Sequence, residues 1–225
     1  MTSPSGTDDL FTAIDAGDAT TVAALVATEP ALAGARDPAG VSALLHARYR
    51  SDRPVLDGLL AADPPMDVFD AAGLGHLDRL RARLDEDPER VRAFATDGFT
   101  ALHLAAFFGK LEAARTLLDA GASVDTYGRN AFANQPLHAA AAGRHVEVCR
   151  LLLGVGADVE ATQHGGYRPL HEAAGSGDIE LAELFLSAGA DPIATTAEGQ
   201  TPADLAEANG HTDLARRLRE VAMTG

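Results

Sequence analysis

Eight histidines and a single cysteine are the residues of this 225-residue chain that could bind a metal ion or act as a nucleophile. Three of the histidines, His103, His138 and His171, recur at intervals of 35 and 33 residues. An even interval of this length predicts one histidine in each of several stacked units, about 10 Å apart at the usual spacing of packed helices. A zinc ion holds its nitrogen ligands at about 2.0–2.1 Å. The three imidazoles are therefore predicted to be too far apart to share one ion.

Short motifs that assemble a catalytic or cofactor site are absent from the sequence. It contains neither Cys-x-x-Cys nor H-E-x-x-H, and neither G-x-S-x-G nor a glycine-rich phosphate loop. Cys149 takes the place that Ala114, Ala182 and Ala215 take in other copies of a repeated segment. This favours a small buried residue over the alternative of a reactive thiol. We predict no catalytic residue, no metal site and no cofactor, and hence a protein that is not an enzyme.

The charge of the chain bears on its partners. Acidic residues number 33 against 18 basic residues, which gives a formal charge of -15 that is spread along the chain. Affinity for a nucleic-acid backbone comes from neutralising phosphates, and no basic stripe is present to do so. The overall field suits a neutral or basic protein partner better. We therefore predict a protein partner and no binding to nucleic acid.

Membrane spans and secretory leaders have recognisable patterns of apolar and basic residues. No apolar run is long enough to span a membrane, and the first residues lack the basic and apolar stretches of a secretory leader. The single cysteine can form no internal disulfide, which fits a reducing compartment. These features predict a cytoplasmic protein without a membrane partner. One lysine among 18 basic residues, together with abundant alanine, is typical of a GC-rich bacterial genome.

A repeated segment must position these residues. Four copies begin at Thr100, Gln135, Arg168 and Thr201, with spacings of 35, 33 and 33 residues. A threonine hydroxyl there can cap a helix, and the proline that follows three of the starts suits a first helical position. The copy "RPLHEAAGSGDIELAELFLSAGADP" resembles the ankyrin repeat, whose mark is T-P-L-H-x-A-A, then glycine, then a run of leucines, then G-A-D.

The resemblance implies both a fold and a class of function. The expected fold is all-α: an ankyrin-repeat solenoid of about seven helix-turn-helix units with short β-hairpin fingers. In this family the motif histidine normally bonds backbone in the adjoining turn. The implied function is a non-catalytic protein–protein interaction module, here a monomer, that binds a protein partner through its concave groove and fingers. The alternative is a regulatory subunit or inhibitor of a cytoplasmic enzyme that uses the same surface.

Degenerate copies extend the array toward the N-terminus. Residues 10–47 align with residues 68–105 at an offset of 58 without gaps, which equals one unit of 34 residues plus a shortened unit of 24. The connection between the second and third units should therefore lack a full finger. We predict a disordered tail over residues 1–6 and a single domain over residues 7–222. Its units begin near residues 8, 42, 66, 100, 135, 168 and 201, and the first three are degenerate.

Binding residues follow from their place in the unit. Positions seven and eight after each start should face the groove, the residue before each start belongs to a finger, and the finger after residue 126 is two residues longer than its successors. Aromatic and arginine side chains at such places favour binding, although Phe99 and Phe107 could instead fill space between units. The predicted partner-binding residues are Tyr49, Arg50, Leu74, Phe99, Phe107, Phe108, Tyr127, Arg129, Phe132, Tyr167 and Arg168. Among these, Arg50 and Arg168 should rim an apolar patch of Tyr49, Phe107 and Phe108, and in the cores of the units Leu118 and Leu153 should be buried.

Overall fold

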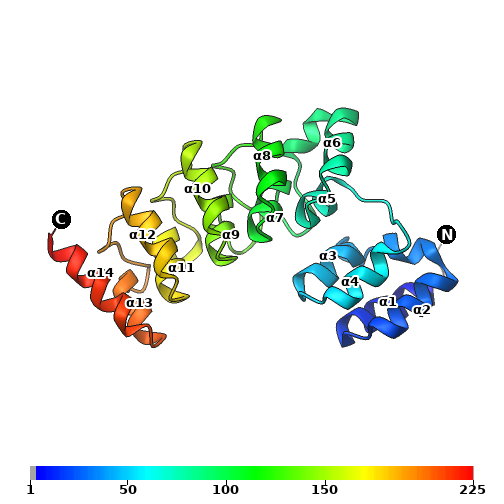
Figure 1. The fold of residues 1–225 in the computed structure, drawn as a ribbon, viewed down its shortest axis with the longest axis horizontal. Coiled ribbons are helices and arrows are strands. Elements are labelled where there is room, and N and C mark those ends of the chain that lie inside the picture. Colours follow the sequence, from blue (N-terminus) through cyan, green and yellow to red (C-terminus); the bar gives the residue numbers. More distant parts are fainter. Residues whose placement is uncertain (1–3, 225) are drawn as a thin grey trace.

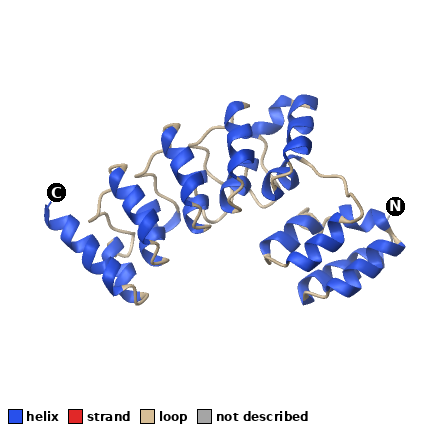
Figure 2. Cartoon of the chain, in the orientation of Figure 1, coloured by secondary structure: helices blue, strands red, loops and turns tan. Residues whose placement is uncertain are grey.

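The computed structural model describes residues 4–224, and in that range helices follow one another from end to end without a sheet (Figure 1, Figure 2). Successive helices pair into antiparallel hairpins that stack side by side. This confirms the all-α solenoid predicted from the repeats. The helices are α1 (Pro4–Ala16), α2 (Ala19–Thr28), α3 (Ala43–Tyr49), α4 (Arg53–Leu60), α5 (Val68–Leu74), α6 (Leu77–Glu86), α7 (Ala101–Phe107), α8 (Leu111–Asp119), α9 (Pro136–Ala142), α10 (Val146–Gly154), α11 (Pro169–Gly175), α12 (Ile179–Ser187), α13 (Pro202–Ala208) and α14 (Thr212–Thr224).

Several first helices, among them α3 and α13, begin where the sequence supplies a cap. The hydroxyl of Ser42 accepts from the backbone N–H of Leu45 at 3.1 Å, and Thr201 does the same for Asp204 at 3.2 Å. A side-chain oxygen at this place satisfies one of the backbone donors that a helix start leaves unpaired. At the other end of α5, Gly75 adopts a φ of 77°, a left-handed conformation that glycine enters without a steric penalty.

The N-terminal boundary differs from its prediction. Residues 4–6, assigned from sequence to a disordered tail, form the first turn of α1, where a proline is tolerated because its missing N–H would be unpaired anyway. The first three residues of that predicted tail lie outside the described residues. The third unit, predicted to begin near residue 66, begins with Asp67 as the cap of α5.

The connections between units are turns with very little strand character. In the described chain two isolated antiparallel bridges close such turns, Arg36 with Ser42 and Phe94 with Thr100. Each bridge follows a short 3-10 helix, Pro30–Gly34 or Pro88–Arg92. Both pairs of features are 58 residues apart, so the offset read from sequence corresponds to a repeated local structure.

The array changes direction between α4 and α5. Residues 61–67 form the connection there and contain neither a 3-10 helix nor a bridge; we call them the bare connection. Figure 1 shows α1–α4 lying across the view, while the helices from α5 to α12 stand more upright. One continuous hydrophobic core nevertheless runs from Leu10 to Leu218. Its second helices bury Leu117 and Leu152 completely. Leu118 and Leu153, which we expected to be buried, are only half-buried, because each lies one residue further around its helix.

Candidate functional site

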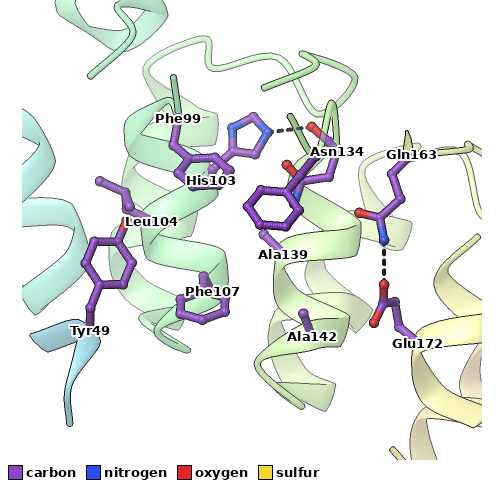
Figure 3. A pocket seen from close by; sticks show the side chains of 11 residues that line it. Tyr49, Phe99, His103, Leu104, Phe107, Asn134, Ala139, Ala142, Gln163 and Glu172 are labelled. Carbon is purple, nitrogen blue, oxygen red and sulfur yellow. Dashed lines mark hydrogen bonds between the residues drawn. The ribbon is translucent and has the colours of Figure 1, made fainter. Parts of the chain in front are cut away.

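A pocket of about 340 Å³ opens among the first helices α3, α7, α9 and α11 and the connections between them. Figure 3 shows its side chains projecting from α3 at one end, across α7 and α9, to α11 at the other. The side chains at one end are aromatic, and those at the other are polar. The lining residues are Tyr49, Phe99, His103, Leu104, Phe107, Phe132, Asn134, Ala139, Ala142, Gln163 and Glu172.

The aromatic end depends on a contact between helices two units apart. The ring of Tyr49 on α3 lies 6.3 Å from that of Phe107 and 5.2 Å from that of Phe108, although α5 lies between in the chain. The side chains of α3 and α7 can meet because Gly73, the residue of α5 that lies between them, has no side chain. A Cβ atom on Gly73 would lie 3.1 Å from the Leu45 side chain and 3.3 Å from the Phe108 ring. The absence of a side chain at residue 73 therefore lets α3 and α7 approach each other.

Phe108 was predicted to face the groove, and the structure buries it instead. It is 7% exposed and packs in a small cluster with Leu45 and Leu104. The guanidinium of Arg48 lies 4.7 Å from the centre of its ring and donates to its backbone carbonyl at 3.3 Å. Because α7 ends at Phe107, the ring of Phe108 turns away from the groove and into the junction between α3 and α7.

Tyr49 and Phe107 keep their predicted places in the groove. They are 39% and 38% exposed, so their rings are available to a bound molecule. The hydroxyl of Tyr49 also donates to a carboxylate oxygen of Asp97 at 2.9 Å. Burial, with a smaller effect from Asp97, raises the pKa of Tyr49 above its ordinary value, so the hydroxyl remains a donor at neutral pH.

The long finger after residue 126 is folded down onto its neighbours. The backbone N–H of Arg129 donates to the Gly98 carbonyl at 2.8 Å, and the backbone N–H of His164 donates to the Phe132 carbonyl at 2.9 Å. These bonds bring Phe132 into the pocket wall, where 61% of its surface is exposed. The other two predicted residues of this finger lie elsewhere: Arg129 stacks 3.8 Å over the Phe94 ring, and Tyr127 is exposed outside the pocket.

Neutral, backbone-bonded groups form part of the polar lining. His103 is 1% exposed, and its Nε2 donates to the Asn134 carbonyl at 3.0 Å while its Nδ1 accepts from the backbone N–H of Thr100 at 3.3 Å. Burial lowers the pKa of His103 to about 4, so the ring is neutral at pH 7. The side-chain Oδ1 of Asn134 is buried and has no hydrogen-bond partner.

Glu172 brings the only formal charge at neutral pH to the residues that line this pocket. Its Oε1 accepts from the amide of Gln163, and burial raises the pKa of Glu172 above its ordinary value. Sequence reasoning missed both residues. A signal was present, because Glu172 stands four residues after its cap, where the two preceding units carry Leu104 and Ala139 in the same pocket wall.

A second depression adjoins the aromatic end of the pocket and shares Tyr49, Phe99 and Phe132 with it. It contains three carboxylates and the guanidinium of Arg50, which lies 3.7 Å from an Asp15 carboxylate oxygen. Arg50 therefore lies beside the aromatic end of the pocket, as predicted, but it is engaged in an ion pair with Asp15. The three carboxylates belong to Asp15, Asp37 and Asp97.

The other predicted binding residues lie outside the pocket. Leu74 is half-buried against the main core. Tyr167 packs edge-on against His171 with 5.9 Å between ring centres. Arg168 is paired with Glu160 at 3.2 Å, so it does not rim the apolar patch as we expected. All three occupy the positions in the unit that the sequence predicted, but their side chains contact other residues of the chain instead of lining the pocket.

In residues 4–224 no three His, Cys, Asp or Glu side chains gather closely enough to hold a metal ion. None of the helices described there combines the length and the apolar character needed to cross a bilayer. Cys149 is buried, and burial raises the pKa of its thiol to about 12, which disfavours the thiolate.

Comparison with known proteins adds a family and three relatives. The family model described as ankyrin repeats (3 copies) matches residues 68–163 and 137–223. A probable E3 ubiquitin-protein ligase of Oryza sativa subsp. japonica is 44% identical over 95 residues, which are 41% of this chain and 21% of that protein. The ankyrin repeat and SAM domain-containing protein 6 of Mus musculus is 36% identical over 134 residues, 55% of this chain and 15% of the relative.

The third relative is the neurogenic locus notch homolog protein 4 of Homo sapiens, which is 36% identical over 100 residues, 44% of this chain and 5% of that protein. The chain thus spans about a fifth or less of the length of these curated relatives. All three come from eukaryotes, so the bacterial source expected from composition stays a prediction.

Proposed function

Because the chain belongs to the ankyrin repeat family, whose repeats are generally protein–protein interaction modules, we propose that it binds a segment of a partner protein in the aromatic pocket. The observation that carries this proposal is the convergence of four aromatic rings from three successive units on one opening. Tyr49, Phe99, Phe107 and Phe132 come from positions up to 83 residues apart. Buried aromatic anchors dominate the binding energy of protein interfaces.

Exposure of the pocket also supports a binding role. Tyr49, Phe107 and Phe132 each leave more than a third of their surface open to solvent. Contiguous exposed apolar surface of this kind is uncommon on a protein that binds nothing there. The pocket volume lies within the range of about 300–1,000 Å³ that holds small ligands, which is enough for one or two side chains of a bound segment.

The field around the pocket supports a neutral or basic partner. Glu172 lies inside the pocket, and the adjoining depression holds three carboxylates against one arginine. With a formal charge of -15 the chain repels nucleic acid and attracts basic surfaces. A monomeric module in the cytoplasm remains our working proposal, and sedimentation of the purified chain tests the first part of it.

The proposal is tested by removing the exposed rings. Phe107→Ala with Phe132→Ala truncates two anchors whose surfaces are 38% and 61% exposed, so the fold should remain intact. We expect a partner captured from the native extract, once identified and purified, to bind at least about 30-fold more weakly, the equivalent of one anchor of about 2 kcal/mol. Isothermal calorimetry measures the affinity, and circular dichroism checks the fold.

A matched control truncates an equally exposed side chain elsewhere. Ile193 is 61% exposed and does not line the pocket, so Ile193→Ala should leave the affinity unchanged. Unchanged binding by the folded double variant would place the partner on another surface and reject the proposal.

A further inference from the structure

The aromatic pocket contains a negative charge that the chain does not neutralise. Glu172 accepts a hydrogen bond from the neutral amide of Gln163, and no Arg, Lys or His of residues 4–224 forms an ion pair with it. Other acidic side chains at unit boundaries have such partners, for example Asp178 with Arg144 at 3.0 Å and Glu160 with Arg168 at 3.2 Å. A carboxylate partly withdrawn from water without a cation is unfavourable for the free protein.

The hydrogen-bonding groups at the polar end of the pocket are mostly acceptors that the chain leaves unpaired. The Oδ1 of Asn134 is buried without a partner, and the Glu172 carboxylate has oxygen lone pairs beyond the one that Gln163 uses. The Nε2 donor of His103 is already committed to the Asn134 backbone carbonyl. A ligand that supplies several N–H donors complements this arrangement, and ammonium and guanidinium groups supply three and five.

The aromatic walls suit the same kind of group. Cations bind favourably over the faces of Tyr and Phe rings within about 6 Å of their centres. The chain uses this interaction twice nearby, with Arg48 at 4.7 Å from the Phe108 centre and Arg129 at 3.8 Å from the Phe94 centre. The rings that line the pocket have no cation of their own, since no Lys or Arg is among the lining residues.

Resting on the proposed function, we propose that the pocket receives a lysine or arginine side chain of the bound segment. Its cationic group lies by the Glu172 carboxylate at the polar end, and its aliphatic stem points along the pocket toward the aromatic end. The carboxylates of the adjoining depression steer a basic segment to this place.

The experiment selects ligands without assuming an identity. A library of random dodecapeptides is selected on the folded full-length chain, and enriched peptides are synthesised. We expect them to share a lysine or arginine. Replacing that residue by norleucine or citrulline, which keep the shape and remove the charge, should weaken binding at least about tenfold.

The variant Glu172→Gln tests the protein side of the same contact. Glutamine keeps an acceptor for Gln163, and removing a carboxylate whose pKa burial raises should leave the melting temperature unchanged or higher. We expect this variant to bind the basic peptide at least about tenfold more weakly and to show no further loss with the neutral peptide. Glu147→Gln makes the same charge change on the exposed side of α10 and should stay within about twofold of wild type.

The outcomes separate the two proposals. Enriched peptides without a basic residue, whose binding is lost with Phe107→Ala and Phe132→Ala, would overturn the cation proposal and leave the groove function standing. Equal binding by Glu172→Gln and wild type would also overturn it. A selection that enriches no peptide at all would overturn both.

Discussion

Successive units are joined differently in the two halves of the array. From α7 onward, the third residue of three successive first helices is a neutral histidine that reaches forward. His103, His138 and His171 donate to backbone carbonyls of the next connection at 3.0, 3.3 and 3.1 Å. In α5 the same position is Asp70, which reaches backward: it accepts from the Ser42 hydroxyl and, at 3.3 Å, from a guanidinium preceding α3.

The difference follows from the connections that are available. A forward-reaching histidine needs a finger whose carbonyl points at the ring. After α4 there is only the bare connection of residues 61–67, and α3 accordingly carries Leu45 at the histidine position. Leu45 is 3% exposed and packs against Leu104 and Phe108. Where the backbone partner is missing, an apolar contact across two units takes its place.

The largest expected effect breaks that apolar contact. Phe108→Ala should lower the free energy of unfolding by about 3–5 kcal/mol, because it removes a buried ring and leaves a cavity between α3 and α7. Phe107→Ala removes the same number of atoms from a ring that is 38% exposed and should cost much less. Urea titration of both variants measures the difference, and equal losses would show that the junction does not depend on Phe108.

A smaller effect is expected from removing one of the histidines that hydrogen-bond to the next connection. His138→Ala leaves the backbone N–H of Gln135 and the Tyr167 carbonyl without their partner, which should cost about 1–3 kcal/mol. His164→Ala is the control, because that side chain is exposed and its change should stay within about 0.5 kcal/mol. Thermal melts of the two variants distinguish them, and indistinguishable melting temperatures would contradict a structural role for the motif histidine.

The smallest expected effect is a difference in the pH dependence of stability between the buried histidines and Asp70. Burial lowers the pKa of His103 and of His138 to about 4, below the ordinary 6.5. Between pH 7 and pH 5 the unfolded chain therefore binds more protons at these sites, and stability falls on acidification. Burial and the neighbouring Asp67 raise the pKa of Asp70 from 3.8 to about 6, so its contribution has the opposite sign.

Asp70→Asn removes this opposing contribution. Between pH 7 and pH 5 the free energy of unfolding of the variant should fall by about 1 kcal/mol more than that of wild type. Urea titrations at the two pH values measure this difference. An equal loss in the variant and in wild type would mean that Asp70 does not titrate in this window.

The sequence by itself determined the repeating part of the molecule. Helix starts at Ser42, Thr100 and Thr201 could be assigned because a cap is a local interaction within four residues. The offset of 58 likewise identified two copies that share a 3-10 helix and a bridge. Tyr49 and Phe107 could be placed in the groove because helix position relative to a cap fixes which way a side chain points.

Only the tertiary structure decided which residues form the pocket. A repeat period reports contacts between neighbouring units, whereas Tyr49 meets Phe107 across two units, through the gap that Gly73 leaves at the change of direction after residue 60. Phe132 joins them because backbone bonds fold its finger down, and Glu172 completes the far end. These contacts join residues far apart in the chain, so their geometry depends on how the units stack and not on any local pattern.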